Sequence, residues 1–197
     1  MAQIQIYLKI KLKQNGVVTG SATADGHAGD LLIDTFRWSE SLEAGTSGGR
    51  TANGSSQSVK DFEFTMAMNR ASPIVMLASL MMDPVLEATL CCRHQSTNTS
   101  ATTDDFVKWT LQNGVISSYE TLGSVESVIP RDRFTIRFRS IGVNFRPIAT
   151  DGSLGTTISA QFDLGTMSSG GSSSGSSAGG GGGSAGGGGG GGAGGSS

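Results

Sequence analysis

The chain has 197 residues, enough for one domain with a sizeable core, and 31 of them are glycine. Its formal net charge is −2, without the basic stripe that nucleic-acid binding requires. No run of about 18 apolar residues predicts a membrane helix, and the N-terminus lacks the basic and apolar regions of a signal peptide. We therefore expect synthesis and folding in the cytoplasm, with no nucleic-acid partner and no membrane insertion.

The N-terminal segment predicts a half-buried antiparallel strand, because apolar and polar residues alternate over residues 4–13. The residues that share the apolar face are Ile4, Ile6, Leu8, Ile10 and Leu12, and Tyr7 lies on the other face. A polar stretch of small residues follows at 14–30. Residues 31–38 then predict a second strand, since they are rich in β-forming residues.

Residues 39–58 predict a long loop, because they are dense in Gly, Ser and Asn and offer little to bury. Loops of this length inside a compact domain are usually functional or disordered. Alternation returns at 59–66, where Phe62, Phe64 and Met66 share one face. The segment therefore predicts a strand.

A single helix of about ten residues is predicted after that strand. Ser72 is expected as the N-cap and Pro73 as the first helical residue, and Asp83-Pro84 ends the element. The apolar residues at helical spacing, expected to pack against the rest of the domain, are Ile74, Leu77, Ala78 and Met81.

The second half of the chain predicts only strands, at 87–93, 106–111, 115–119, 134–145 and 154–164. Asn113-Gly114 predicts a tight hairpin turn between two of them. Within 134–145 the apolar phase shifts by one residue, as a β-bulge produces. These elements predict a mainly β fold, a β-barrel of about eight strands or a tightly packed sandwich, with one flanking α-helix.

From Gly165 to Ser197 the chain contains only Gly, Ser and Ala besides one Thr and one Met. We therefore divide it into a β domain at 1–164 and a Gly/Ser-rich low-complexity tail at 165–197. Ordering such a coil costs about 1–2 kcal/mol per residue in conformational entropy. We expect the tail to be ordered only where neighbouring subunits of an assembly pack against it.

The candidate chemical groups do not predict an enzyme. Cys91 and Cys92 are adjacent and would point to opposite faces of a strand, so we expect small buried or half-buried hydrophobes and not a disulfide or metal pair. Neither His27 nor His94 has a second ligand at metal-binding spacing, and no nucleophile elbow or P-loop is present. We expect no catalytic residue, metal or cofactor, and a structural or inter-subunit hydrogen-bonding role for His27.

The order of these pieces resembles a known family. The residues that carry the resemblance are the strand at 6–10, Gly26-His27-Ala28-Gly29, Phe36-Arg37-Trp38-Ser39, the strand at 59–65, the Ser72-Pro73 helix and Asn144-Phe145-Arg146-Pro147. From residue 4 to about 164 the chain resembles the haemolysin-coregulated protein (Hcp) family of type VI secretion. The Gly-rich tail is not part of the common family domain. The chain could therefore form a tube that does not serve type VI secretion.

The resemblance implies a β-barrel subunit with one flanking helix that assembles into hexameric rings. Such rings stack head to tail into a tube inside a contractile sheath, and the tube is expelled with its spike and effectors by a route independent of a signal peptide. The family has no catalytic residues. Two alternatives stay open: a secreted carrier or chaperone module for effector cargo, and a freestanding extracellular tubular filament.

In a ring-stacking protein the 39–58 loop would reach the neighbouring ring. Its glycines permit close backbone approach, Leu42 offers an apolar anchor, and Glu43 or Arg50 could pair across the contact. The expected interface residues are Ser41, Leu42, Glu43, Gly48, Arg50, Asn53 and His27.

Overall fold

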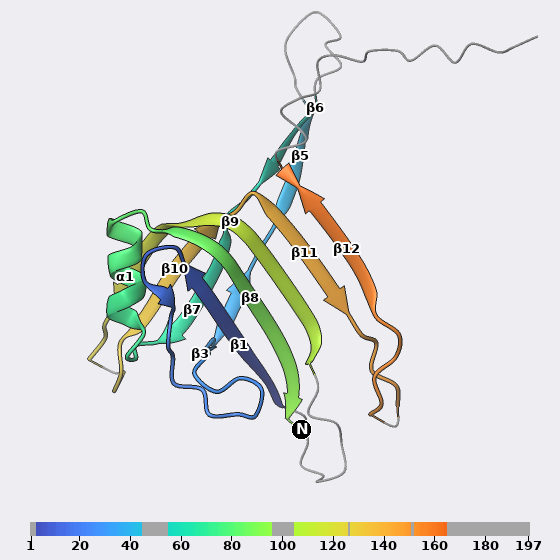
Figure 1. Cartoon of the computed structure of the whole chain (residues 1–197), viewed down its shortest axis with the longest axis horizontal. Helices are drawn as coiled ribbons and strands as arrows, with labels where there is room; N and C mark the ends of the chain where they lie inside the picture. Colours follow the sequence, from blue (N-terminus) through green and yellow to red (C-terminus); the bar gives the residue numbers. More distant parts are fainter. Residues whose placement is uncertain (1–2, 45–54, 96–104, 126, 151, 165–197) are drawn as a thin grey trace, which may run out of the picture.

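The computed structural model describes residues 3–44, 55–95, 105–125, 127–150 and 152–164. Figure 1 shows a strongly curved sheet with the helix on one side and a narrow hairpin projecting from it. The elements are β1 (Gln3–Leu12), β2 (Gly16–Val17), β3 (Leu31–Leu32), β4 (Thr35–Arg37), β5 (Glu40–Ala44), β6 (Ser55–Val59), β7 (Phe62–Ala67), α1 (Ser72–Leu80), β8 (Pro84–Gln95), β9 (Asp105–Leu122), β10 (Arg131–Arg137), β11 (Ser140–Phe145) and β12 (Ile158–Asp163).

Ten strands form one antiparallel sheet, and its main path runs β2-β1-β8-β9-β10-β7-β4. In addition β3 pairs with β1, β11 pairs with β9, and β12 pairs with β11. The predicted mainly β fold with one flanking helix is confirmed. The strands outnumber the expected eight mainly because β2, β5 and β6 form in segments predicted as loops. Two predicted strands are also divided in two, and two others merge into β9. No helix in the described parts of the chain has the length and apolar character that a membrane crossing requires.

The predicted strand at 31–38 is two short strands that together close the barrel. β3 pairs with β1, whereas β4 pairs with β7 at the other end of the sheet path. Between them, the backbone N–H of Ile33 donates to the Ile6 carbonyl on β1 at 3.0 Å, and that of Asp34 donates to the Thr65 carbonyl on β7 at 2.8 Å. The segment therefore steps from one edge of the sheet to the other.

The predicted hairpin turn at Asn113-Gly114 is wrong, because residues 105–122 form the single strand β9. Asn113 does have a positive φ of 54°, which is the property that predicted a turn. The chain nevertheless continues, and its partner on one side changes here from β11 to β10. A Cβ on Gly114 would lie 2.4 Å from the Arg137 carbonyl oxygen, so the close approach requires glycine.

The apolar phase predicted to shift within 134–145 does shift, but the single bulged strand expected there is wrong, because the chain divides into β10 and β11. β10 pairs with the second half of β9, with a register shift between Thr135 and Ile136, and β11 pairs with the first half. Phe134 and Ile136 are buried before the break, and Ile141 is buried after it. β9 is therefore shared by the barrel and by the β11–β12 hairpin, which extends to one side in Figure 1.

Aromatic side chains fill the centre of the barrel. The rings of Phe62 and Phe64 on β7 lie 4.9 Å apart between centroids, and Phe64 and Phe134 lie 5.3 Å apart. All three are fully buried with Met66, which confirms the predicted inner face of this strand. Full burial of one such side chain contributes about 1.5–3 kcal/mol, so this cluster stabilises the barrel substantially.

Along β1, the predicted apolar face is buried only in its second part. Leu8, Ile10 and Leu12 lie in the core, whereas Ile4 is 51 % exposed at the start of the strand. Tyr7, on the opposite face, is also buried, because the 14–30 segment folds over it.

The predicted helix is confirmed as α1, but it begins one residue earlier than expected. Its N-cap is Ala71, and Ser72 is the first helical residue, followed by Pro73. The Ser72 hydroxyl accepts the backbone N–H of Asn69 at 2.9 Å instead of capping the helix.

The predicted packing face of the helix is largely wrong. The buried residues are Ser72, Val75 and Ala78, which are small and let the helix approach β9 closely. Of the predicted set only Ala78 is buried. Leu77 is 40 % exposed, and Ile74 and Met81 are also exposed. Residue size, which the spacing of apolar positions ignores, decides which face meets the sheet.

The predicted loop at 39–58 contains a separate two-stranded sheet. β5 and β6 pair antiparallel from Glu40 opposite Val59 to Ala44 opposite Ser55, and the hairpin projects away from the barrel. Val59 ends β6, so the strand predicted at 59–66 begins only at Phe62. The intervening residues 45–54 lie outside the described part of the chain. Backbone pairing forms this hairpin despite its polar composition, which is why apolar periodicity did not reveal it.

The last strand is shorter and more exposed than its alternation predicted. β12 starts at Ile158, and Leu154 forms only an isolated bridge with Ile148. Ile158 and Phe162 are 62 % and 40 % exposed. Within the described residues β12 pairs with β11 alone, so one of its edges is open.

Candidate assembly surfaces

The predicted interface segment lies on the projecting β5–β6 hairpin. Ser41 is exposed on β5, and Leu42 and Glu43 are the next two residues of that strand. Three further predicted residues lie outside the described part of the chain, namely Gly48, Arg50 and Asn53. A role of this segment in ring stacking stays a prediction.

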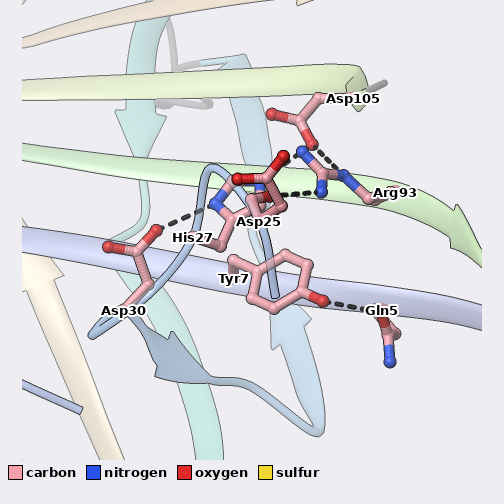
Figure 2. A network of polar contacts seen from close by, with 7 residues as sticks. All are labelled: Gln5, Tyr7, Asp25, His27, Asp30, Arg93 and Asp105. Carbon is pink, nitrogen blue, oxygen red and sulfur yellow. Dashed lines mark hydrogen bonds and ion pairs between the residues drawn. The ribbon is translucent and has the colours of Figure 1, made fainter. Parts of the chain in front are cut away.

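His27 lies elsewhere, in a polar network that fastens the 14–30 segment to the sheet (Figure 2). The side chain is 6 % exposed, its Nδ1 is 2.9 Å from an Asp30 carboxylate oxygen, and its Nε2 is 3.0 Å from an Asp105 carboxylate oxygen. The ring stacks on Tyr7 at 4.1 Å between centroids. These contacts fit the structural role that was one of its two predicted roles, and a role between subunits stays a prediction.

Arg93 completes the network from β8. Its Nε lies 3.1 Å from the Asp105 carboxylate, and its Nη1 donates to the Asp25 carbonyl at 2.8 Å. The guanidinium carbon also lies 5.9 Å from the centre of the Tyr7 ring. The arginine therefore neutralises Asp105 and joins the 14–30 segment to the strands beneath it (Figure 2).

His27, Cys91 and Asp105 bring three groups that could bind a metal within 4.8 Å of one another. Sequence spacing missed this cluster, because strand pairing brings together residues far apart in the chain. The groups fit a metal poorly. Both ring nitrogens of His27 and the Asp105 carboxylate already have protein partners. Burial, with a further contribution from Asp105, raises the pKa of the Cys91 thiol to about 12, whereas metal binding needs the thiolate.

The two cysteines behave as the sequence predicted. Both are buried and unbonded to each other on β8. Cys91 lies near Asp105 in the polar network, and Cys92 lines an apolar pocket on the other side of the sheet. Burial raises the pKa of Cys92 to about 11, again with a smaller contribution from Asp105.

The part of the sheet formed by β9, β11 and β12 has one polar face. Uncharged side chains of alternate residues line a shallow depression of about 340 Å³ there, among them Thr110, Gln112, Asn144, Ser159 and Gln161. Because alternate residues of a strand point to opposite faces, the other face receives the apolar residues.

That opposite face forms an apolar pocket of about 500 Å³. We call it the barrel pocket, and its walls include Ile4, Ile6, Phe36, Trp109, Val143 and Phe145. A second apolar depression, of about 330 Å³, shares Trp109 and Val143 with it and extends to Phe162 on β12. The described residues thus leave a continuous apolar surface uncovered, which is typical of a protein–protein interface.

A small antiparallel barrel with an apolar sheet face left uncovered by the described residues is typical of a structural subunit that assembles. The model of the family described as "Type VI secretion system effector, Hcp" matches residues 7–145. The chain therefore belongs to the Hcp family, a family of structural tube proteins of type VI secretion, and the resemblance seen in the sequence is confirmed.

Solved structures show the same fold. One described as a type six secretion system protein has a TM-score of 0.69 at 20 % identity, covering 83 % of this chain and 98 % of its own. Hcp1 from Salmonella typhimurium has a TM-score of 0.61 at 20 % identity, covering 84 % and 97 %. The secreted protein Hcp3 from Pseudomonas aeruginosa has a TM-score of 0.56 at 14 % identity, covering 82 % and 98 %. Comparison with curated protein sequences gives no match.

Proposed function

We propose that this chain is the subunit of a tube built from stacked six-membered rings, which type VI secretion expels together with effector cargo. The observation that carries the proposal is the family match over residues 7–145. The subunit acts through its surfaces and does no chemistry of its own.

The uncovered surfaces of the subunit support assembly. In the part of the chain that the structure describes, β12 has an open edge, and an open strand edge readily pairs with another chain. The exposed Ile158 and Phe162 on the same strand would lose contact with water in a complex. A contact between two different surfaces of successive subunits generates a ring when its rotation closes.

The projecting β5–β6 hairpin supports stacking. It makes a separate two-stranded sheet, and it extends beyond the barrel, where a second ring would lie (Figure 1). We propose that Ser41, Leu42 and Glu43 on β5, together with residues 45–54, contact the next ring.

Export supports the same function. One solved relative is described as a secreted protein, Hcp3 from Pseudomonas aeruginosa. We propose that this chain leaves the cell in the same assembled form, by a route that does not use a signal peptide, with a sheath and a spike as its partners.

Electron microscopy and native mass spectrometry of the purified chain test the proposal. We expect six-fold rings in class averages, a hexamer mass, and tubes at high protein concentration. A stable monomer or dimer at the concentrations where tubes are expected would contradict it. Hexamers that never stack, even at high concentration, would favour the alternative of a secreted carrier for cargo.

A further inference from the structure

We infer that the polar network around His27 binds one proton, which makes the His27 ring an imidazolium cation held between two carboxylates. This inference concerns the fold of one subunit, and it does not depend on assembly into a tube.

The contacts of the His27 ring require two donors. Its Nδ1 lies 2.9 Å from an Asp30 carboxylate oxygen, and its Nε2 lies 3.0 Å from an Asp105 carboxylate oxygen (Figure 2). An ionised carboxylate can only accept hydrogen bonds, whereas a neutral imidazole has one N–H donor and one acceptor nitrogen. A neutral ring would therefore place its bare nitrogen against a carboxylate. Both contacts are hydrogen bonds only if the network binds an additional proton.

The additional proton belongs on the ring and not on a carboxyl group. Histidine is the stronger base, with an ordinary pKa of about 6.5 against about 3.9 for aspartic acid. The Asp105 oxygen that faces the ring also accepts a hydrogen bond from the Arg93 Nε at 3.1 Å, so this oxygen carries no proton. The ring stacks flat on Tyr7, with 4° between the two planes, and an aromatic face attracts a cation.

The charges around the ring balance only with this proton. The groups that face it come from its own segment and from three strands, and they are Asp25, Asp30, Tyr7, Cys91, Arg93, Asp105 and, beside Cys91, Lys108. Burial raises the pKa of the Cys91 thiol to about 12 and also raises that of Tyr7, so both are neutral. In direct contact, two carboxylates then face one guanidinium. An imidazolium cancels the remaining negative charge, and an uncompensated charge is costly to bury.

The bound proton attaches the turn at residues 24–30 to the sheet. Within the turn, the His27 N–H donates to the Ala24 carbonyl at 3.0 Å, and the Asp30 N–H donates to the His27 carbonyl at 2.9 Å. The bond from the ring to Asp105 joins the turn to β9, and the bond from Arg93 to the Asp25 carbonyl joins it to β8. Loss of the proton leaves one carboxylate against a bare nitrogen, so alkaline solution should loosen this attachment.

Nitrogen NMR of the histidine rings tests the inference directly. The chain has two histidines, so spectra of the ¹⁵N-labelled chain contain two ring systems, and His94→Ala identifies the signals of His27. Magic-angle spinning of sedimented protein makes the measurement independent of the size of any assembly. At about pH 7.5, one unit above the ordinary histidine pKa of about 6.5, we expect both His27 nitrogens to be protonated. A bare nitrogen in the His27 ring would overturn the inference.

Asp30→Asn removes the need for the additional proton. The amide NH₂ of asparagine can donate to Nδ1 while the Nε2–H donates to Asp105, so a neutral ring is fully bonded. We expect a bare Nδ1 in this variant. Asp25→Asn is the matched control, because Asp25 is exposed in the same turn and joins the network through its backbone carbonyl, and its ring should keep both protons. Two ring protons in folded Asp30→Asn would contradict the role of the carboxylate pair.

The dependence of stability on pH gives a second measurement. Above about pH 6.5 the unfolded chain releases a proton that the folded chain keeps, so the folding equilibrium constant should decrease by up to about tenfold per pH unit. We expect this decrease in denaturant series between about pH 6.5 and about pH 8 for the unaltered chain, and a flat profile for Asp30→Asn. Equal slopes in the two chains would overturn the inference. If Asp30→Asn does not fold, the ring spectrum of the unaltered chain decides alone.

Discussion

Cys91 and Cys92 are neighbours in sequence but lie in different surroundings within the sheet, and both stay protonated in the folded chain. Burial raises their pKa values to about 12 and about 11, from an ordinary value of 9.0. The thiolate is the reactive form, so both thiols should be poor nucleophiles. We expect iodoacetamide at pH 8 to leave the native protein unlabelled and to add two groups after unfolding, as measured by intact mass. Labelling of the native chain would contradict the burial.

The same pKa shifts make stability depend on pH. A thiol whose pKa is higher in the folded state favours folding below its unfolded pKa, and this contribution falls as pH rises through the folded pKa. We therefore expect the free energy of unfolding to decrease from about pH 9 toward pH 11–12. A Cys91→Ala/Cys92→Ala chain, measured in the same denaturant series, should show a shallower decrease.

His27 should contribute to stability through its two carboxylate partners and its stacking on Tyr7. His27→Ala removes the bonds to Asp30 and Asp105 and the stacking on Tyr7, although Asp105 keeps its bond to Arg93. A typical hydrogen bond contributes about 0.5–1.5 kcal/mol, so two bonds and the lost ring contact should together cost about 1–3 kcal/mol in chemical denaturation. His94→Ala is the control. His94 lies near the end of β8, its ring contacts that of Phe106 on β9, and within the described residues it makes no bond to a carboxylate. Equal losses in the two variants would contradict the importance of the network.

At the scale of elements, α1 packs on the sheet through Ser72, Val75 and Ala78. Val75 is fully buried against the sheet, whereas Leu77 is 40 % exposed. Val75→Ala removes two buried methyl groups and leaves a cavity, so it should cost about 1.5–3 kcal/mol, whereas Leu77→Ala should cost less than about 1 kcal/mol. Denaturant midpoints of the two variants measure the difference. A larger loss for Leu77→Ala would show that the helix packs through its other face.

The close approach of β9 to the Arg137 carbonyl of β10 depends on Gly114. A Cβ there would meet the Arg137 carbonyl oxygen at 2.4 Å, so Gly114→Ala must displace backbone, at a cost of about 1–3 kcal/mol. Gly142→Ala on the neighbouring β11 is the control, because its nearest contact would be an ordinary 3.8 Å. We expect thermal unfolding to be lowered in the first variant and nearly unchanged in the second.

These elements also show how far the sequence alone predicts the fold. Alternation identified β1 and the inner face of β7 because burial on one face of a strand imposes a period of two. Asn113-Gly114 was misinterpreted because a positive φ serves a bend within a strand as well as a hairpin turn. The polar network was missed for a different reason: Tyr7, His27 and Asp105 meet only after β1, β8 and β9 have paired.

At the scale of the whole molecule, stacking should depend on the tip of the β5–β6 hairpin more than ring formation does. Replacing residues 45–54 by a short turn removes the tip and leaves the five paired positions of β5 and β6 in place. We expect hexameric rings of normal stability that no longer form long tubes in electron micrographs. A chain with the shortened hairpin that polymerises as well as the parent would show that stacking uses another surface.

During synthesis, β1 is translated well before β8, with which it pairs along its length. Leu12 lies opposite Val85, so roughly 70 further residues must be translated before the first strand meets its main partner. At about 5–20 residues per second, this interval lasts about 4–14 s. Throughout it Leu8, Ile10 and Leu12 have no sheet on which to pack, and an unpaired apolar strand is prone to aggregate. A ribosome that stalls before residue 84 therefore releases a chain that cannot close a barrel, and the cell meets it as a substrate for chaperones and proteases.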